Sequence, residues 1–135
     1  MYKKDLIQRQ FEEFGLVLAR ILGYKRERDW AKFEEELAIA LKEFSEHEIT
    51  LLELQSKEEF ETSIILNKTL SFEKKKIIAR LLFEKMLSYE ERGDSVHYQN
   101  LKQKCLTLYT HLRGELTHQH YDLEIHYHLE SLKRN

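Results

Sequence analysis

Two sets of side chains that could bind a metal ion lie near the C-terminus of the chain, each with a spacing of four residues. The sets are His118, Asp122 and His126, and His120, Glu124 and His128. Residues four apart lie on the same face of an α-helix, so each set would form a narrow stripe. Imidazole and carboxylate groups are common ligands of Zn²⁺ and Fe²⁺. The pattern therefore predicts, as one alternative, a metal-binding or metal-sensing helical protein.

The spacing also limits this metal site. Eight residues of α-helix rise about 12 Å, which is too far for the first and last members of a set to hold one ion. A metal site would therefore need two ligands from this helix and others from elsewhere, such as His111, Glu115 or a second subunit. The competing interpretation is a solvated stripe in which each carboxylate pairs with the histidine four residues after it. We favour this second interpretation, which predicts no cofactor.

The other candidates for chemistry are few. Cys105 is the only cysteine and lies at helical spacing between Leu101 and Leu108, which favours a buried, inert thiol. Lysines 74–76 could contact phosphate, but the net charge of −2 and the lack of a wide basic region argue against nucleic acid. The sequence contains neither a nucleophile elbow nor a phosphate-binding glycine loop. We therefore expect a non-enzymatic protein.

The composition indicates the class of protein that positions these residues. The 135 residues are 41% hydrophobic and 34% charged, with no proline and four glycines, which is typical of one globular helical domain. Apolar stretches such as residues 16–19 are too short to span a bilayer. The N-terminal residues lack the apolar run of a secretory signal. We expect a cytoplasmic protein that does not bind membranes.

Apolar residues follow a helical period through most of the chain. Asp29 and Ser71 are predicted N-caps, and Gly23 is a predicted helix end. Glu34 lies in an acidic run that is most simply a solvated face. Together these signals predict an all-α chain with helical hairpins.

We expect a single domain over residues 1–135. Its hairpins are predicted near residues 4–45 and 72–113, with an irregular helical middle at 46–70 and an extra C-terminal helix at 115–133. The two hairpins match at a separation of 68 residues. The matching positions are Trp30, Phe33, Leu37, Ala40, Leu41 and Phe44 with Tyr98, Leu101, Cys105, Leu108, Tyr109 and Leu112. This separation is twice the 34-residue period of a tetratricopeptide repeat (TPR).

Several short motifs resemble TPR half-repeats. Phe11-x2-Phe14-Gly15-x2-Leu18 resembles the first-helix pattern, and Phe33-x3-Leu37-x2-Ala40 resembles the second-helix pattern. Each hairpin has about six extra residues between the half-patterns, and the proline that ends a TPR is missing. The resemblance implies antiparallel hairpins stacked as a short TPR-like right-handed array.

Residues 1–113 also resemble an uncharacterised bacterial family of small TPR-like helical proteins. The residues that carry the resemblance are Met1-Tyr2-Lys3-Lys4-Asp5-Leu6-Ile7, Phe14-Gly15, Leu18-Ala19-Arg20-Ile21-Leu22-Gly23, Ala79-x2-Leu82, Tyr89-Glu90-Glu91-Arg92-Gly93-Asp94 and Leu106-x-Leu108-Tyr109. The family supplies no catalytic residue. TPR-like arrays bind proteins or peptides, so we expect a non-enzymatic protein–protein interaction or scaffold module.

The last predicted helix has apolar residues on two nearly opposite faces. Leu116, Leu123 and Tyr127 lie on one face. The other face consists of Tyr121, Ile125, Leu129 and Leu132. A terminal helix needs only one apolar face to lie on its own core, so the second face is predicted to contact a partner, giving a homodimer as one form of the interaction. The alternative is that these residues lie partly exposed or under the N-terminal helix.

Overall fold

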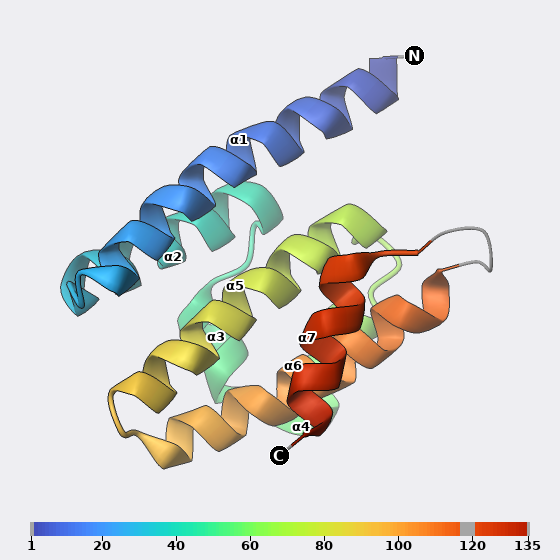
Figure 1. Cartoon of the computed structure of the whole chain (residues 1–135). Coiled ribbons are helices and arrows are strands. Elements are labelled where there is room, and N and C mark those ends of the chain that lie inside the picture. The colour runs from blue at the N-terminus through green and yellow to red at the C-terminus, as the bar shows by residue number, and fades with distance from the viewer. Residues whose placement is uncertain (1, 117–120, 135) are drawn as a thin grey trace.

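The chain is helical throughout the residues that the structure describes. The computed structural model describes residues 2–116 and 121–134, without the side chains of residues 2–5 and 7, and contains no strand in these ranges. None of the described helices is long and apolar enough to cross a membrane. In chain order the elements are α1 (Tyr2–Arg26), α2 (Trp30–Ser45), α3 (Ile49–Leu54), α4 (Lys57–Phe60), the π-helical turn η1 (Glu61–Ile65), α5 (Phe72–Glu91), α6 (Ser95–Glu115) and α7 (Leu123–Lys133) (Figure 1).

Two antiparallel hairpins, α1–α2 and α5–α6, form most of the fold (Figure 1). Their turns are alike. Asp29 and Asp94 cap α2 and α6, and each side chain accepts a hydrogen bond from the backbone N–H three residues later. The residues before the caps, Arg28 and Gly93, have φ values of 57° and 75°. This left-handed conformation suits glycine and is costly for arginine.

The repeat in the structure differs in one respect from the repeat in the sequence. The backbone N–H of Asp29 donates to the carbonyl of Tyr24, and that of Asp94 donates to Tyr89, at 2.9 Å each. The two turns are therefore 65 residues apart instead of 68. The difference of three residues is close to one helical turn, so the buried faces of α2 and α6 still match at the predicted separation. The matched buried pairs are Phe33 and Leu101, Leu37 and Cys105, Ala40 and Leu108, and Leu41 and Tyr109.

Helix α5 is the central element of the core, because it contacts α6, α2 and α1. Consecutive positions along it are buried, which is typical of a helix that is covered on several sides. The buried residues of its middle part are Ile77, Ile78, Ala79, Leu81, Leu82, Phe83 and Met86.

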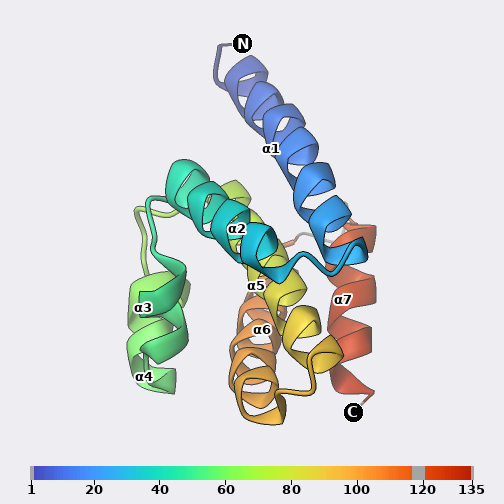
Figure 2. The ribbon, with the colours of Figure 1, turned by 90° about the vertical axis from the view of Figure 1, so that its left-hand side faces the viewer.

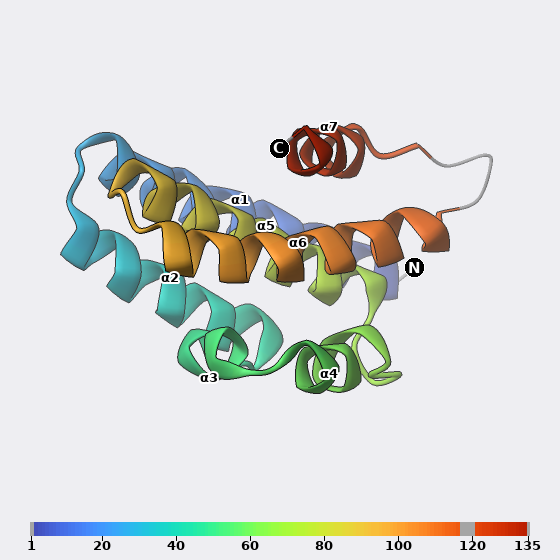
Figure 3. The same ribbon diagram turned by 90° about the horizontal axis from the view of Figure 1, so that it is seen from below.

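The middle of the chain, residues 46–70, contains two short helices and a π-helical turn. A capping box begins α4: Ser56 Oγ accepts from the N–H of Glu59 at 3.1 Å, and Glu59 Oε1 accepts from the N–H of Ser56 at 2.9 Å. Phe60 and Ile64 are buried in the core. Figures 2 and 3 show α3 and α4 on one side of α6 and α7 on the other.

The last helix is shorter than the predicted range of 115–133. Helix α6 runs through Gly114 to Glu115, so Gly114 does not end it, and α7 begins only at Leu123. Asp122 is the N-cap of α7, and its Oδ1 accepts from the N–H of Ile125 at 3.1 Å. Aspartate is one of the strongest N-caps, which explains why α7 begins at this point.

Candidate functional site

The predicted partner face of the last helix packs on the core of its own chain. Ile125, Leu129 and Leu132 are buried, whereas Tyr121 is 69% exposed. The prediction of a partner face is therefore corrected at three of its four residues. Tyr121 precedes the N-cap of α7 and does not share the direction of the helical stripe. The face that includes Leu123 and Tyr127 remains exposed instead.

The carboxylates of the predicted metal stripes are paired with cations of α5. Lys76 Nζ donates to Asp122 Oδ2 at 2.5 Å and lies 3.7 Å from Glu124 Oε2. Arg80 Nη1 donates to Glu124 Oε1, also at 2.5 Å. Burial raises the pKa of Asp122, but the hydrogen bonds from Lys76 and from the N–H of Ile125 lower it further, so the net pKa lies below the usual value.

The histidines of the stripes have different surroundings. His128 Nδ1 lies 2.9 Å from the hydroxyl of Tyr109, and its ring stacks on Phe83 with centroids 4.1 Å apart. Burial lowers the pKa of His128. His126 contacts the rings of the exposed Tyr121 and of Tyr127.

His118 and His120 lie outside the described residues. Within residues 2–116 and 121–134, no group of three or more His, Cys, Asp or Glu side chains is arranged to hold a metal ion. His111, another suggested ligand, lies 2.7 Å from Glu115 and 3.1 Å from Lys75 Nζ.

A chain of ion pairs joins α1, α5 and α7. Its members, in order, are Lys25, Glu84, Arg80, Glu124, Lys76 and Asp122. Glu84 is almost fully buried and binds two cations, with Lys25 Nζ and Arg80 Nε each at 3.0 Å. Burial lowers the pKa of Arg80, but its carboxylate partners Glu84 and Glu124 raise it further, so Arg80 stays charged. These charges fix how α1 and α7 sit on α5.

A cleft opens beside this chain of ion pairs, between α1, α5 and α7. Its volume is about 220 Å³. Its lining combines apolar and charged side chains: Phe11, Phe14, Gly15, Leu18, Lys76, Ile77, Arg80 and Glu124. Lys76 Nζ also lies 5.9 Å from the centre of the Phe11 ring, within the range of a cation–π contact. The N-terminal part of α1 projects away from the other helices (Figures 1 and 2).

Helix α1 is much longer than its hairpin partner α2. Helix α1 has 25 residues and its hairpin partner α2 has 16. At 1.5 Å per residue α1 is longer by about 13 Å, so the N-terminal part of α1 has no hairpin partner. The large residues of the first half-repeat motif, Phe11, Phe14 and Leu18, form one wall of the cleft.

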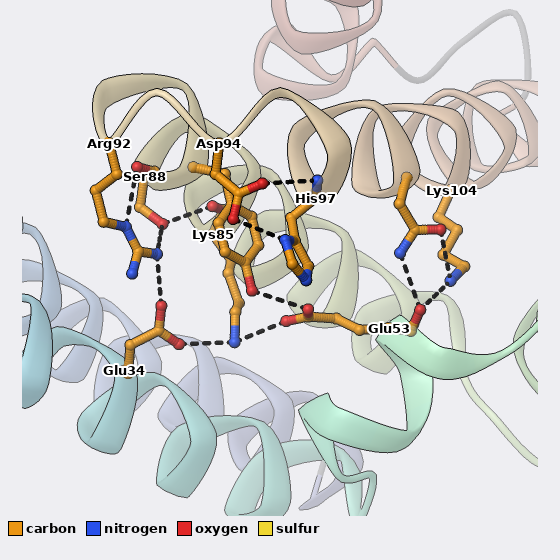
Figure 4. Close-up of polar contacts among 10 residues, drawn as sticks. Glu34, Glu53, Lys85, Ser88, Arg92, Asp94, His97 and Lys104 are labelled. Atoms are coloured by element: carbon orange, nitrogen blue, oxygen red, sulfur yellow. Dashed lines mark hydrogen bonds and ion pairs between the residues drawn. The ribbon is translucent and has the colours of Figure 1, made fainter.

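A second buried polar network joins α2, α3 and α5 around Lys85 (Figure 4). Lys85 Nζ lies 2.7 Å from both Glu34 and Glu53. Arg92 donates to Glu34 at 2.6 Å, and the Tyr89 hydroxyl donates to Glu53 at 2.9 Å. Burial and the hydrogen bond to Glu53 raise the pKa of Tyr89. Glu34, which the sequence placed on a solvated face, is half-buried and takes part in this network.

The same network holds α3 against α6. Asn100 Nδ2 and Lys104 Nζ donate to the backbone carbonyl of Glu53 at 2.9 and 2.8 Å. Burial lowers the pKa of Lys104, although Glu53 and Glu59 raise it in part. Because these charged groups are paired with one another, the arrangement serves to position helices. Sequence reasoning missed the network because its partners lie 32 to 58 residues apart and no local pattern links them.

At least three other depressions are present among the described residues. One of about 180 Å³ lies between α4 and α6 and has a mostly polar rim that includes Asn100 and Gln103. A second, about 490 Å³, is a wide depression between α2 and α3 beside Ile39. A third, about 460 Å³, lies at the C-terminal end of α1 and is lined mainly by charged side chains: Lys25, Arg26, Arg28 and Glu91, with Leu22. The cleft differs from the other depressions because it lies between the first helices of the two hairpins and because two phenylalanines, Phe11 and Phe14, line it.

No family model matches the chain, and no curated protein or solved structure gives a significant match.

Proposed function

We propose that this protein is a non-enzymatic protein–protein interaction module, built from two TPR-like hairpins, that binds an apolar helix or peptide of a partner in the cleft between α1, α5 and α7. The observation that carries the proposal is the cleft itself. Phe11, Phe14 and Leu18 line it from α1, and Ile77 lines it from α5. An apolar helix that lies in a hydrophobic groove is a recurring mode of peptide recognition.

The packing order of the hairpins supports the comparison with a TPR array. The second helix of the first hairpin, α2, contacts the first helix of the second hairpin, α5. Helical repeats stack in this way, each unit on its neighbour, and use the resulting concave surface for binding.

The size of the cleft favours a protein partner over a free small molecule. A volume of about 220 Å³ is below the roughly 300–1,000 Å³ of pockets for drug-sized ligands. It exceeds the roughly 150 Å³ of an apolar cavity that can hold benzene. The cleft therefore has room for one large apolar side chain, such as the anchor residue of a partner helix.

The charged rim would orient the partner. Lys76 and Arg80 lie on the α5 side and Glu124 lies on α7, so both signs of charge border the apolar walls. Rim charges contribute more to orientation and specificity than to affinity. We therefore expect apolar anchors to provide most of the binding free energy.

Gly15 provides a test that fills the cleft without disturbing the core. A Cβ atom at Gly15 would have no other atom within 4 Å, so Gly15→Leu would extend into open space. Gly114 has the same open surroundings on α6, away from the cleft, and Gly114→Leu is the matched control. Both substitutions raise helix propensity by about 1 kcal/mol. A difference in peptide affinity between the two variants therefore reflects where the new leucine lies.

The experiment selects helical peptides that bind the wild-type protein from a display library and then measures their affinity for the two variants. We expect binding to weaken at least about tenfold in Gly15→Leu and to stay within about twofold in Gly114→Leu. Equal affinity for both variants, or a selection that yields no binder, would refute the proposal. Thermal unfolding of each variant checks that it is folded.

A further inference from the structure

The outer face of α1 carries two exposed leucines with two charged residues between them. The residues are Leu6, Arg9, Glu13 and Leu16, whose spacing of three, four and three places them on one side of the helix. Leu6 is 57% exposed and Leu16 is 75% exposed, and Arg9 and Glu13 are also exposed. This face lies away from Phe14 and Ile21, which turn toward the core.

No other part of the described chain covers this face. Within the described residues, neither Arg9 nor Glu13 takes part in an ion pair. The N-terminal part of α1 also projects from the molecule, so a second molecule can approach it without meeting the other helices (Figures 1 and 2).

We infer that a second copy of this chain docks on this face, with the two α1 helices antiparallel and related by a two-fold axis. The four residues are self-complementary in that arrangement. Leu6 would face Leu16 of the second copy, and Arg9 would face Glu13 of the second copy. Positions 6 and 16 have their midpoint at position 11, and so do positions 9 and 13. A single two-fold axis at position 11 therefore forms both kinds of pair. This charge complementarity is what makes a second copy the occupant.

The opposite orientation is unfavourable. A parallel pair in register would place Arg9 against Arg9 and Glu13 against Glu13, and like charges at close range destabilise a contact. The antiparallel arrangement replaces these repulsive pairs by two ion pairs and sets two leucine contacts at the ends. The charges on α1 therefore favour the antiparallel pairing and disfavour the parallel pairing.

The predicted dimer is weak and lies apart from the cleft. From Leu6 to Leu16 the contact extends about 15 Å along the helix, which is small for a stable interface. We expect a dissociation constant on the order of 100 µM. Because these side chains do not line the cleft, the inference goes beyond the proposed function.

A charge exchange tests the pairing directly. Arg9→Glu and Glu13→Arg should each weaken dimerisation by about tenfold, because each creates two like-charge pairs. The double variant restores opposite charges at both pairs and should return to within about threefold of the wild type. Sedimentation equilibrium up to millimolar concentration measures all four proteins. A wild type that stays monomeric, or a double variant no better than the singles, would overturn the inference.

Cross-linking tests the orientation. In a mixture of the Leu6→Cys and Leu16→Cys proteins, a short bis-maleimide should join the two variants to each other. Either protein alone should cross-link poorly, because identical positions would lie about 15 Å apart. Cys105 is fully buried and does not interfere. Efficient cross-linking of Leu6→Cys to itself would contradict the antiparallel arrangement. Gly15→Leu should weaken peptide binding in the cleft but leave dimerisation unchanged. The two hypotheses can therefore fail independently of each other.

Discussion

Removal of the positive charge at Lys85 should destabilise the fold strongly, because Lys85 balances two carboxylates in the interior. Its side chain is 8% exposed and its Nζ lies 2.7 Å from both Glu34 and Glu53. Loss of one partner of a buried ion pair costs about 3–5 kcal/mol. Glu34 retains Arg92 and Glu53 retains the Tyr89 hydroxyl, so we expect Lys85→Met to lose about 3 kcal/mol of unfolding free energy.

Urea unfolding monitored by circular dichroism measures this loss, and the melting temperature should fall by about 10 °C. Lys42→Met is the matched control. Lys42 is 61% exposed in its side chain and lies 3.7 Å from Glu48, so its loss should cost no more than about 0.5 kcal/mol. Adding Glu53→Gln to Lys85→Met should recover stability, because the amide introduced at this position still accepts the Tyr89 hydrogen bond without a charge. A loss below about 1 kcal/mol for Lys85→Met, or strictly additive losses in the double variant, would refute this account of the network.

Three further predictions concern the turns and α7. Gly93→Ala should cost about 1 kcal/mol in urea unfolding, because φ is 75° at Gly93 and its surroundings are open; no loss would contradict the assigned conformation. Leu129→Ala should cost about 2–4 kcal/mol and Leu123→Ala less than about 0.5, and similar losses would mean that α7 does not present the buried face described. Burial lowers the folded-state pKa of His128, so the unfolded chain binds more protons below about pH 6.5, and the unfolding free energy should decrease as the pH falls from there. His128→Gln should reduce this decrease, and an unchanged pH dependence would show that His128 is not its source.

The long helices could be predicted from the sequence because their signals are local. The apolar stripe through Phe11, Phe14 and Leu18 and the cap at Asp29 each depend on neighbours within a few residues. The boundary at Asp122 was missed because a periodic pattern that continues past a cap does not show where the chain leaves the helix.

The faces of α7 show what local periodicity omits. Two opposite apolar faces were recognised from the sequence, but which one meets the core depends on α5 and α6, which come from earlier in the chain. The carboxylates Asp122 and Glu124 pair with Lys76 and Arg80, more than 40 residues away, and no helical spacing predicts such partners.

The cleft could be predicted only in part. Its apolar wall on α1 follows from the sequence, but the opening depends on where α5 and α7 lie relative to α1. The resemblance to TPR proteins predicted a binding surface without indicating its position.

The most direct test of the central claim is to locate a bound peptide by NMR. The experiment adds a selected peptide to ¹⁵N-labelled protein and follows the backbone amide shifts. If the cleft is the binding surface, the largest changes should occur at residues 11–18 of α1 and 76–80 of α5, and Gly15→Leu should abolish them. Changes confined to α3, to α4 or to the exposed face of α7 would contradict the account.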